Sequence, residues 1–210
     1  MLKVPTRHKA EAILEDAAIR NPGPWADHSR VVARTAQTIA EHHPAIDPQS
    51  AYVVGLLHDI GRREGVTDMR HVLDGYLFLQ NEGFPDAARI CLTHSFPIPF
   101  AGAGAGQWDC NAAELEFVQS YLDQIEYNPY DRLIQLCDAL CLPSGPVLME
   151  KRLMDVALRH GFNEYTLEKW QAFLAIQADF EAVLGRSIYS LLPDVVENTF
   201  VLDGLKSSTK

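Results

Sequence analysis

The segment Ala51-Tyr-Val-Val-Gly-Leu-Leu-His58-Asp59-Ile-Gly61 is apolar on every face of a helix until it reaches a histidine and an aspartate. A helix that is apolar all round is a buried helix. An imidazole and a carboxylate placed side by side in a core are costly unless both are paired, hydrogen-bonded or bound to a metal ion. The segment therefore predicts a buried helix that carries His58 and Asp59 to a place where another group neutralises them.

On both sides of this segment, apolar residues recur at helical spacing, and runs that alternate at period two are scarce. The pattern predicts an all-α fold. Asp47 followed by Pro48 is a typical helix start, and Asn21-Pro-Gly-Pro24 is a typical stop. The expected helices cover residues 6–20, 25–43, 47 to 61 or 65, 68–81, 85–94, 111–124, 129–142, 146–159 and 165–184.

Residues 95–109 break this pattern, because they are rich in Pro, Gly and Ala and carry no helical stripe. The alternating glycines of 101–106 are not followed by Gly-Lys-Ser/Thr and no strand precedes them, which excludes a phosphate-binding loop of the P-loop type. We expect a loop here. A plain connector is slightly favoured over a mobile lid beside a pocket.

The composition limits the class of protein. With 210 residues, 47% of them hydrophobic, the chain can form one well-packed core, and we expect a single domain over 1–210. No run approaches the ~20 apolar residues of a membrane span, and we expect a cytoplasmic protein without membrane contact. The net charge of −10 argues against a partner such as duplex nucleic acid. A small anion could still bind near Arg62, Arg63 and Arg70.

Polar residues suited to metal binding also occur on other apolar helices. His28 lies on the core-facing stripe of its predicted helix, Asp138 sits in an almost wholly apolar segment, and His94 ends a helix with an apolar inner face. A single buried histidine is more often a hydrogen-bonded core residue than a ligand. The joint occurrence of such residues on four helices favours a metal site. His8, His42, His43 and His160 occupy polar segments or helix ends and are set aside.

The order His28, then His58-Asp59, then Asp138 resembles the HD superfamily of metal-dependent phosphohydrolases, and His58-Asp59-Ile60-Gly61 matches its signature. The resemblance runs from about 25 to 142. It implies an HD-domain helical bundle, here with additional C-terminal helices over about 146–205. It also implies that these four side chains bind a divalent metal ion.

The binuclear branches of that superfamily imply two further ligands, His71 and His94, with the HD aspartate bridging both ions. Ser95 stands where some branches carry a second, adjacent histidine, and this departure argues against a third ion. The expected cofactor is thus one or two divalent transition metal ions held by His28, His58, Asp59, His71, His94 and Asp138. Imidazole and carboxylate ligands suit Fe or Mn first, with Zn, Ni, Co and Mg as alternatives.

The resemblance also implies a reaction, in which metal-activated water hydrolyses a phosphoester. We expect Asp59 and Arg62 to be the catalytic residues. Arg62 occupies the place of a basic residue in many family members, and it is assigned to the substrate phosphate together with Arg63. Arg70 and Lys151 are weaker candidates. The expected partner is a small phosphorylated substrate such as a nucleotide.

Two other functions stay open at this point. A few HD proteins use the same six ligands for a mixed-valent di-iron centre that activates oxygen, and this ligand set fits that branch too. A noncatalytic helical module that binds a nucleotide or a protein, with a structural metal, is also compatible with the acidic surface. The sequence does not fix the substrate, the metal or whether the chain forms a homo-oligomer.

Overall fold

The computed structural model describes residues 2–200. This part of the chain is 66% helical and has one two-stranded sheet, which confirms the predicted all-α fold. Its α-helices are α1 (Arg7–Arg20), α2 (Trp25–Ala40), α3 (Pro48–Leu57), α4 (Arg70–Asn81), α5 (Pro85–Thr93), α6 (Ala112–Asp123), α7 (Pro129–Asp138), α8 (Met149–His160), α9 (Thr166–Leu184) and α10 (Val195–Phe200). Short 3-10 helices are η1 (Ile60–Glu64), η2 (Ala101–Ala103) and η3 (Ile188–Ser190).

Helix α3 is the buried helix that its composition predicts. Every residue from Ala51 to Leu57 is buried, and the Asp47 side chain caps the helix by accepting a hydrogen bond from the Ser50 N–H. The helix ends earlier than expected, at Leu57. The chain then turns through His58 and Asp59 into η1, so that these two side chains leave the helix at its C-terminal end.

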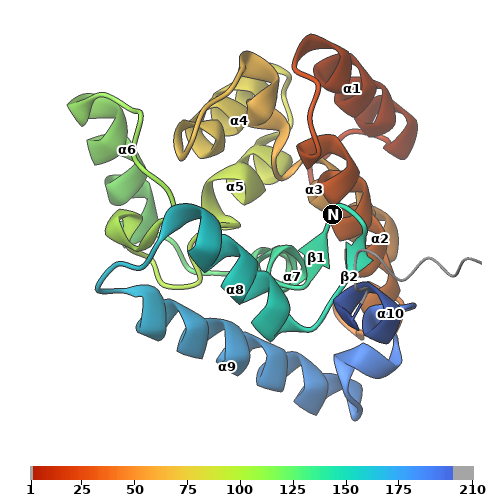
Figure 1. Ribbon diagram of the computed structural model, residues 1–210. Helices are drawn as coiled ribbons and strands as arrows, with labels where there is room; N and C mark the ends of the chain where they lie inside the picture. The colour runs from red at the N-terminus through yellow and green to blue at the C-terminus, as the bar shows by residue number, and fades with distance from the viewer. Residues whose placement is uncertain (1, 201–210) are drawn as a thin grey trace, which may run out of the picture.

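Helix α7 lies at the centre of the bundle, where it contacts α2, α3, α5 and α9 (Figure 1). Asn128 starts it by accepting hydrogen bonds from two N–H groups of the first turn, and Pro129 follows at the first helical position. The buried face of α7 includes Leu133, Ile134 and Cys137, and Asp138 is its last residue. The central helix thus ends on the residue predicted to be a metal ligand.

The chain after Asp138 departs from the predicted helices. Residues 139–142 and 146–148 are not helical, because a short antiparallel hairpin pairs β1 (Cys141–Leu142) with β2 (Gly145–Pro146). Pro143 cannot continue a helix, and Gly145 adopts a φ of +148°, a conformation that favours glycine. The hairpin reverses the chain into α8.

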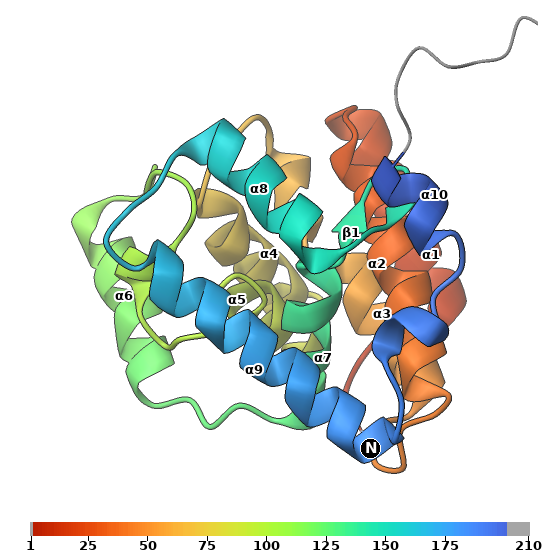
Figure 2. The same cartoon turned by 60° about the horizontal axis from the view of Figure 1, so that its bottom comes forward.

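Helices α8 and α9 extend the bundle beyond α7. In Figure 2, α9 crosses one face of the molecule as a long helix, with α8 above it. The segment 94–111 contains only η2 as regular structure, in agreement with the loop expected there. The helical C-terminal extension expected over about 146–205 includes α8, α9 and α10, and residues 201–205 lie outside the described part. Within residues 2–200, none of the helices combines the length and the hydropathy of a membrane span.

Candidate metal centre

Three of the predicted ligands orient their rings in the same way. In each, Nδ1 lies against a backbone carbonyl oxygen of the residue three positions earlier, at 2.7 Å for His58 and 2.9 Å for His94, and His71 makes the same contact. A carbonyl oxygen only accepts hydrogen bonds, so Nδ1 must carry the proton and donate it. When such a ring is neutral, its Nε2 holds a lone pair, and in His71 this atom also lies 3.4 Å from Nη2 of Arg62. A hydrogen bond from the ring nitrogen that does not bind the metal is the usual way in which a protein fixes the orientation of a metal-binding histidine.

The carboxylate of Asp59 faces these lone pairs with both oxygens. Its Oδ1 lies 3.1 Å from Nε2 of His71 and 3.6 Å from Nε2 of His94. Its Oδ2 lies 4.0 Å from Nε2 of His58 and accepts a hydrogen bond of 2.8 Å from Nε of Arg62. One aspartate therefore stands between two sets of imidazoles.

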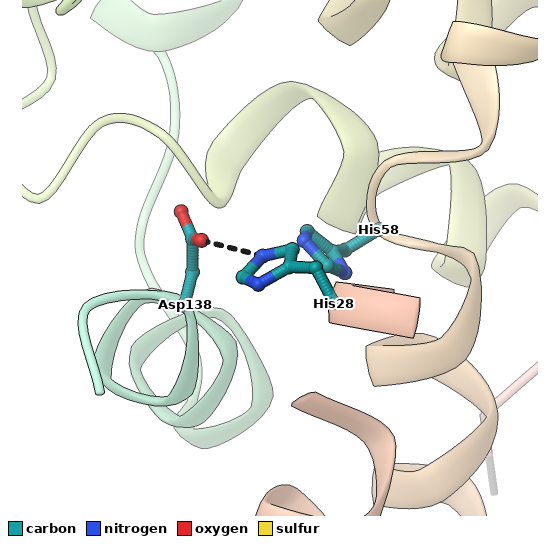
Figure 3. A group of neighbouring side chains, drawn as sticks. All are labelled: His28, His58 and Asp138. Atoms are coloured by element: carbon teal, nitrogen blue, oxygen red, sulfur yellow. Dashed lines mark hydrogen bonds and ion pairs between the residues drawn. The ribbon is translucent and has the colours of Figure 1, made fainter. Parts of the chain in front are cut away.

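His28 and Asp138 complete one side of this arrangement (Figure 3). Nε2 of His28 lies 3.0 Å from Oδ1 of Asp138, and the rings of His28 and His58 are 5.3 Å apart between centroids. One donor atom from each of these three residues lies within 4.8 Å of the others. Donor atoms of His58, Asp59 and His94 meet the same limit. The six predicted ligands therefore converge, although they come from helices far apart in the sequence.

Two atoms in this cluster are buried without a hydrogen-bond partner, namely Nε2 of His58 and Oδ1 of Asp59. The contact between Oδ1 of Asp59 and His71 is short, but its geometry is not that of a hydrogen bond. Burial lowers the pKa of His58, and it lowers the pKa of His94 to about 3, so both rings are neutral at neutral pH. An imidazole lone pair and a carboxylate oxygen that face each other repel unless a cation lies between them. The donor set thus fits a divalent metal ion.

The two aspartates are ionised in this setting. Burial by itself would raise their pKa values, but neighbouring positive groups outweigh it. Arg62 holds the pKa of Asp59 well below its usual range. The hydrogen bond from His28, together with Arg152, does the same for Asp138. Both carboxylates are therefore available as anionic ligands at any pH near neutrality.

The two arginines that follow the His-Asp pair, Arg62 and Arg63, point in different directions. Arg62 lines the cavity beside the cluster. Arg63 does not line it, because its guanidinium stacks 3.9 Å from the ring centroid of Phe78 and pairs with Asp16 at 3.4 Å. In η1, with about three residues per turn, adjacent side chains point roughly 120° apart. The predicted role of Arg63 at the substrate is therefore not supported by its position.

The cluster opens into a cavity of about 260 Å³. Asp59, His71, His94 and Asp138 form part of its floor, and the loop over 103–107 with α8 and α9 forms its walls. Three cationic side chains of these walls, Arg152, Arg159 and Lys169, were not predicted from the sequence. No motif surrounds any of them, and only the packing of α8 and α9 against the bundle brings them to the site.

The fold and the cluster define a helical bundle with a buried centre of histidines and aspartates suited to a divalent metal ion. Comparison with known families finds a match to the HD domain over residues 25–142, more than half of the chain. The chain belongs to the HD domain family, which includes metal-dependent phosphohydrolases. Searches of curated proteins and of solved structures give no match. The resemblance noted in the sequence is confirmed at the level of the family.

Proposed function

We propose that this protein is a metal-dependent phosphohydrolase that cleaves a small phosphoester, with a nucleotide among the candidate substrates. The observation that supports it most is the position of Asp59, whose two oxygens face different imidazoles. His28, His58, Asp59 and Asp138 would hold one divalent ion, and Asp59, His71 and His94 would hold a second. Bound divalent ions of this kind lower the pKa of water and polarise phosphoryl oxygens.

The chain's own residues then have separate tasks. Asp59 and Asp138 supply the negative charge of the centre, and the Nδ1–H bonds of the histidines hold the rings in place. Arg62 lies beside Asp59 at the edge of the cavity, where its guanidinium can bind the substrate phosphate and the charge that develops on it. Hydrolysis adds water across the P–O ester bond, and for a monoester it releases inorganic phosphate and an alcohol.

No side-chain nucleophile is needed in this scheme, and the cysteines near the cluster do not supply one. Cys91 and Cys137 are buried, and burial raises the pKa of both thiols well above the ordinary value. A thiol in that state is protonated and inert at neutral pH. This supports attack by water over a covalent intermediate on the protein.

The test is release of phosphate from a broad panel of phosphoesters by protein loaded with Mn²⁺ or Fe²⁺. We expect turnover that disappears on chelation. Replacing Arg62 by Gln should lower kcat/KM by about 100-fold, since one preorganised charged donor in such a site is worth about 10²–10³ in rate. Arg63→Gln is the matched control, and we expect it to stay within about threefold of the wild type because Arg63 points away from the cavity.

Folded, metal-loaded protein that releases no phosphate or nucleotide from any member of the panel would contradict the proposal. The alternative function, a di-iron oxygenase with the same ligand set, is distinguished by loading the same preparation with iron and measuring oxygen uptake. Substrate-dependent oxygen consumption without phosphate release would assign the site to that other reaction.

A further inference from the structure

Four long cationic side chains line the cavity, namely Arg62, Arg152, Arg159 and Lys169. Three of them are engaged by carboxylates. Arg62 is paired with Asp59 at 2.8 Å, Arg152 with Asp138 at 3.3 Å, and Arg159 with Asp155 at 2.9 Å. Each of these arginines is already neutralised by a neighbouring carboxylate.

Lys169 differs from the other three. Its ammonium donates one hydrogen bond, of 3.1 Å, to the carbonyl oxygen of Ala103, and it forms no ion pair with any residue of the described chain. An ammonium has three N–H donors, so two remain for a ligand. Burial lowers the pKa of Lys169 to about 8, partly opposed by Asp138, which is the behaviour of a cation that lacks a close anion. An anion bound beside it would restore full ionisation.

The wall that carries Lys169 also carries aromatic side chains. Phe162 and Trp170 line the cavity, with ring centroids 6.0 Å apart in an edge-on arrangement. Phe162 is 69% exposed although it is a large apolar ring. A flat apolar group bound against these rings would cover surface that water now contacts. The cavity therefore offers an unneutralised cation next to an aromatic surface.

The volume of the cavity limits what can bind. At about 260 Å³ it falls just below the pockets that enclose drug-sized ligands, which are about 300–1,000 Å³. A small monoester fits such a space, and a long polyanion does not. The unpaired cation and the aromatic surface both belong to α8, α9 and their connection. These elements lie outside the residues 25–142 that match the family.

We infer that Lys169 binds the anionic group of the substrate and that Phe162 and Trp170 bind a flat ring attached to it, so that the substrate is a small phosphomonoester with an aromatic group. This inference rests on the proposed function for the phosphate, and it assigns specificity to the C-terminal helices. Lys169 would contact the substrate directly, whereas Arg152 holds Asp138.

The experiment measures equilibrium binding by calorimetry to the full-length, metal-loaded protein at neutral pH. The probes are phenylphosphonate and ethylphosphonate, which carry the same anion with and without a ring and have no ester bond to hydrolyse. We expect Lys169→Met to lower the affinity for both phosphonates by about tenfold or more, the effect of losing one charged hydrogen bond. Lys9→Met, at an exposed lysine of α1 that pairs with Glu82 and does not line the cavity, is the matched control and should bind both probes as the wild type does.

Phe162→Ala tests the aromatic part without disturbing the core, because Phe162 is mostly exposed. It should lower the affinity for phenylphosphonate by about fivefold and leave the affinity for ethylphosphonate unchanged, as expected for the loss of one aromatic contact. Equal binding of both probes by the wild type would overturn the aromatic part. Unchanged binding by Lys169→Met, or no binding by the wild type, would overturn the role of Lys169.

These outcomes are distinct from failure of the proposed function. If the wild-type protein binds phenylphosphonate through Lys169 but releases no phosphate from any ester, the binding site is supported and the proposed hydrolase activity is contradicted. If the wild type and Lys169→Met hydrolyse esters with the same KM, the hydrolase activity is supported and the role of Lys169 is contradicted.

Discussion

Substituting Asp59 by Asn is expected to lower kcat for phosphoester hydrolysis by about 10³-fold or more, the scale expected when a catalytic centre loses an essential group. The amide keeps the shape of the side chain, but it replaces the anion between His58 on one side and His71 and His94 on the other. One neutral oxygen cannot serve as a ligand to both sides. Turnover should therefore fall together with metal affinity.

The readouts are kcat under metal saturation and the thermal unfolding midpoint of the same preparations. Asp27→Asn is the control, because Asp27 is an exposed carboxylate on α2 whose partner is the surface residue Arg30. A catalytic centre predicts loss of turnover in a protein that still folds. Loss of the folded state in Asp59→Asn, with no activity in the wild type to begin with, would instead support the noncatalytic module with a structural metal.

Replacing Gly61 by Ala is expected to destabilise the protein by about 3 kcal/mol or more, since backbone overlap on this scale exceeds ordinary overpacking. A Cβ atom at this position would lie 1.9 Å from the carbonyl oxygen of His71 and 2.4 Å from the backbone nitrogen of Gly75. Neither atom belongs to a flexible side chain that could move aside. The closeness of η1 and α4 at this point requires glycine.

For a chain of this size, that loss corresponds to a fall of the unfolding midpoint by about 6–12 °C. Gly104→Ala is the comparison, because the nearest atom to its added Cβ is the mobile end of the Met69 side chain, at 3.0 Å. It should change the free energy of unfolding by less than about 1 kcal/mol. Equal midpoints for Gly61→Ala and the wild type would show that η1 and α4 do not approach as described.

Much of the site could be predicted from the sequence because polar, ionisable residues stand there in otherwise apolar segments. A helix that is apolar on all faces and ends in His58 and Asp59 predicts that the helix is buried and that these two polar side chains have partners. The same argument holds for His28, which lies on a core-facing stripe, and for Asp138, which lies in an almost wholly apolar segment. Their meeting in one cluster follows from the way α2, α3 and α7 pack, and the structure bears out this convergence. Their role as metal ligands stays a prediction.

Other parts of the site carried no local signal. His71 lies in a segment with no distinctive pattern, and only the resemblance to the HD superfamily indicated it. Arg152, Arg159 and Lys169 lie on helices that carry no motif, and they reach the cavity only because the hairpin at 141–146 turns the chain back over α7. That hairpin was missed because a two-residue strand is too short to show any period. The direction of Arg63 depends on the tighter turn of η1, which the residue spacing does not reveal.

The most direct test of the metal centre is elemental analysis of protein that is purified without an immobilised-metal column, loaded with Mn²⁺ and desalted. We predict two ions per chain for the wild type, one for His94→Ala, and two for His8→Ala, whose histidine is exposed on α1 and distant from the cluster in sequence. A wild-type chain that retains less than one ion would contradict the account, whatever its fold.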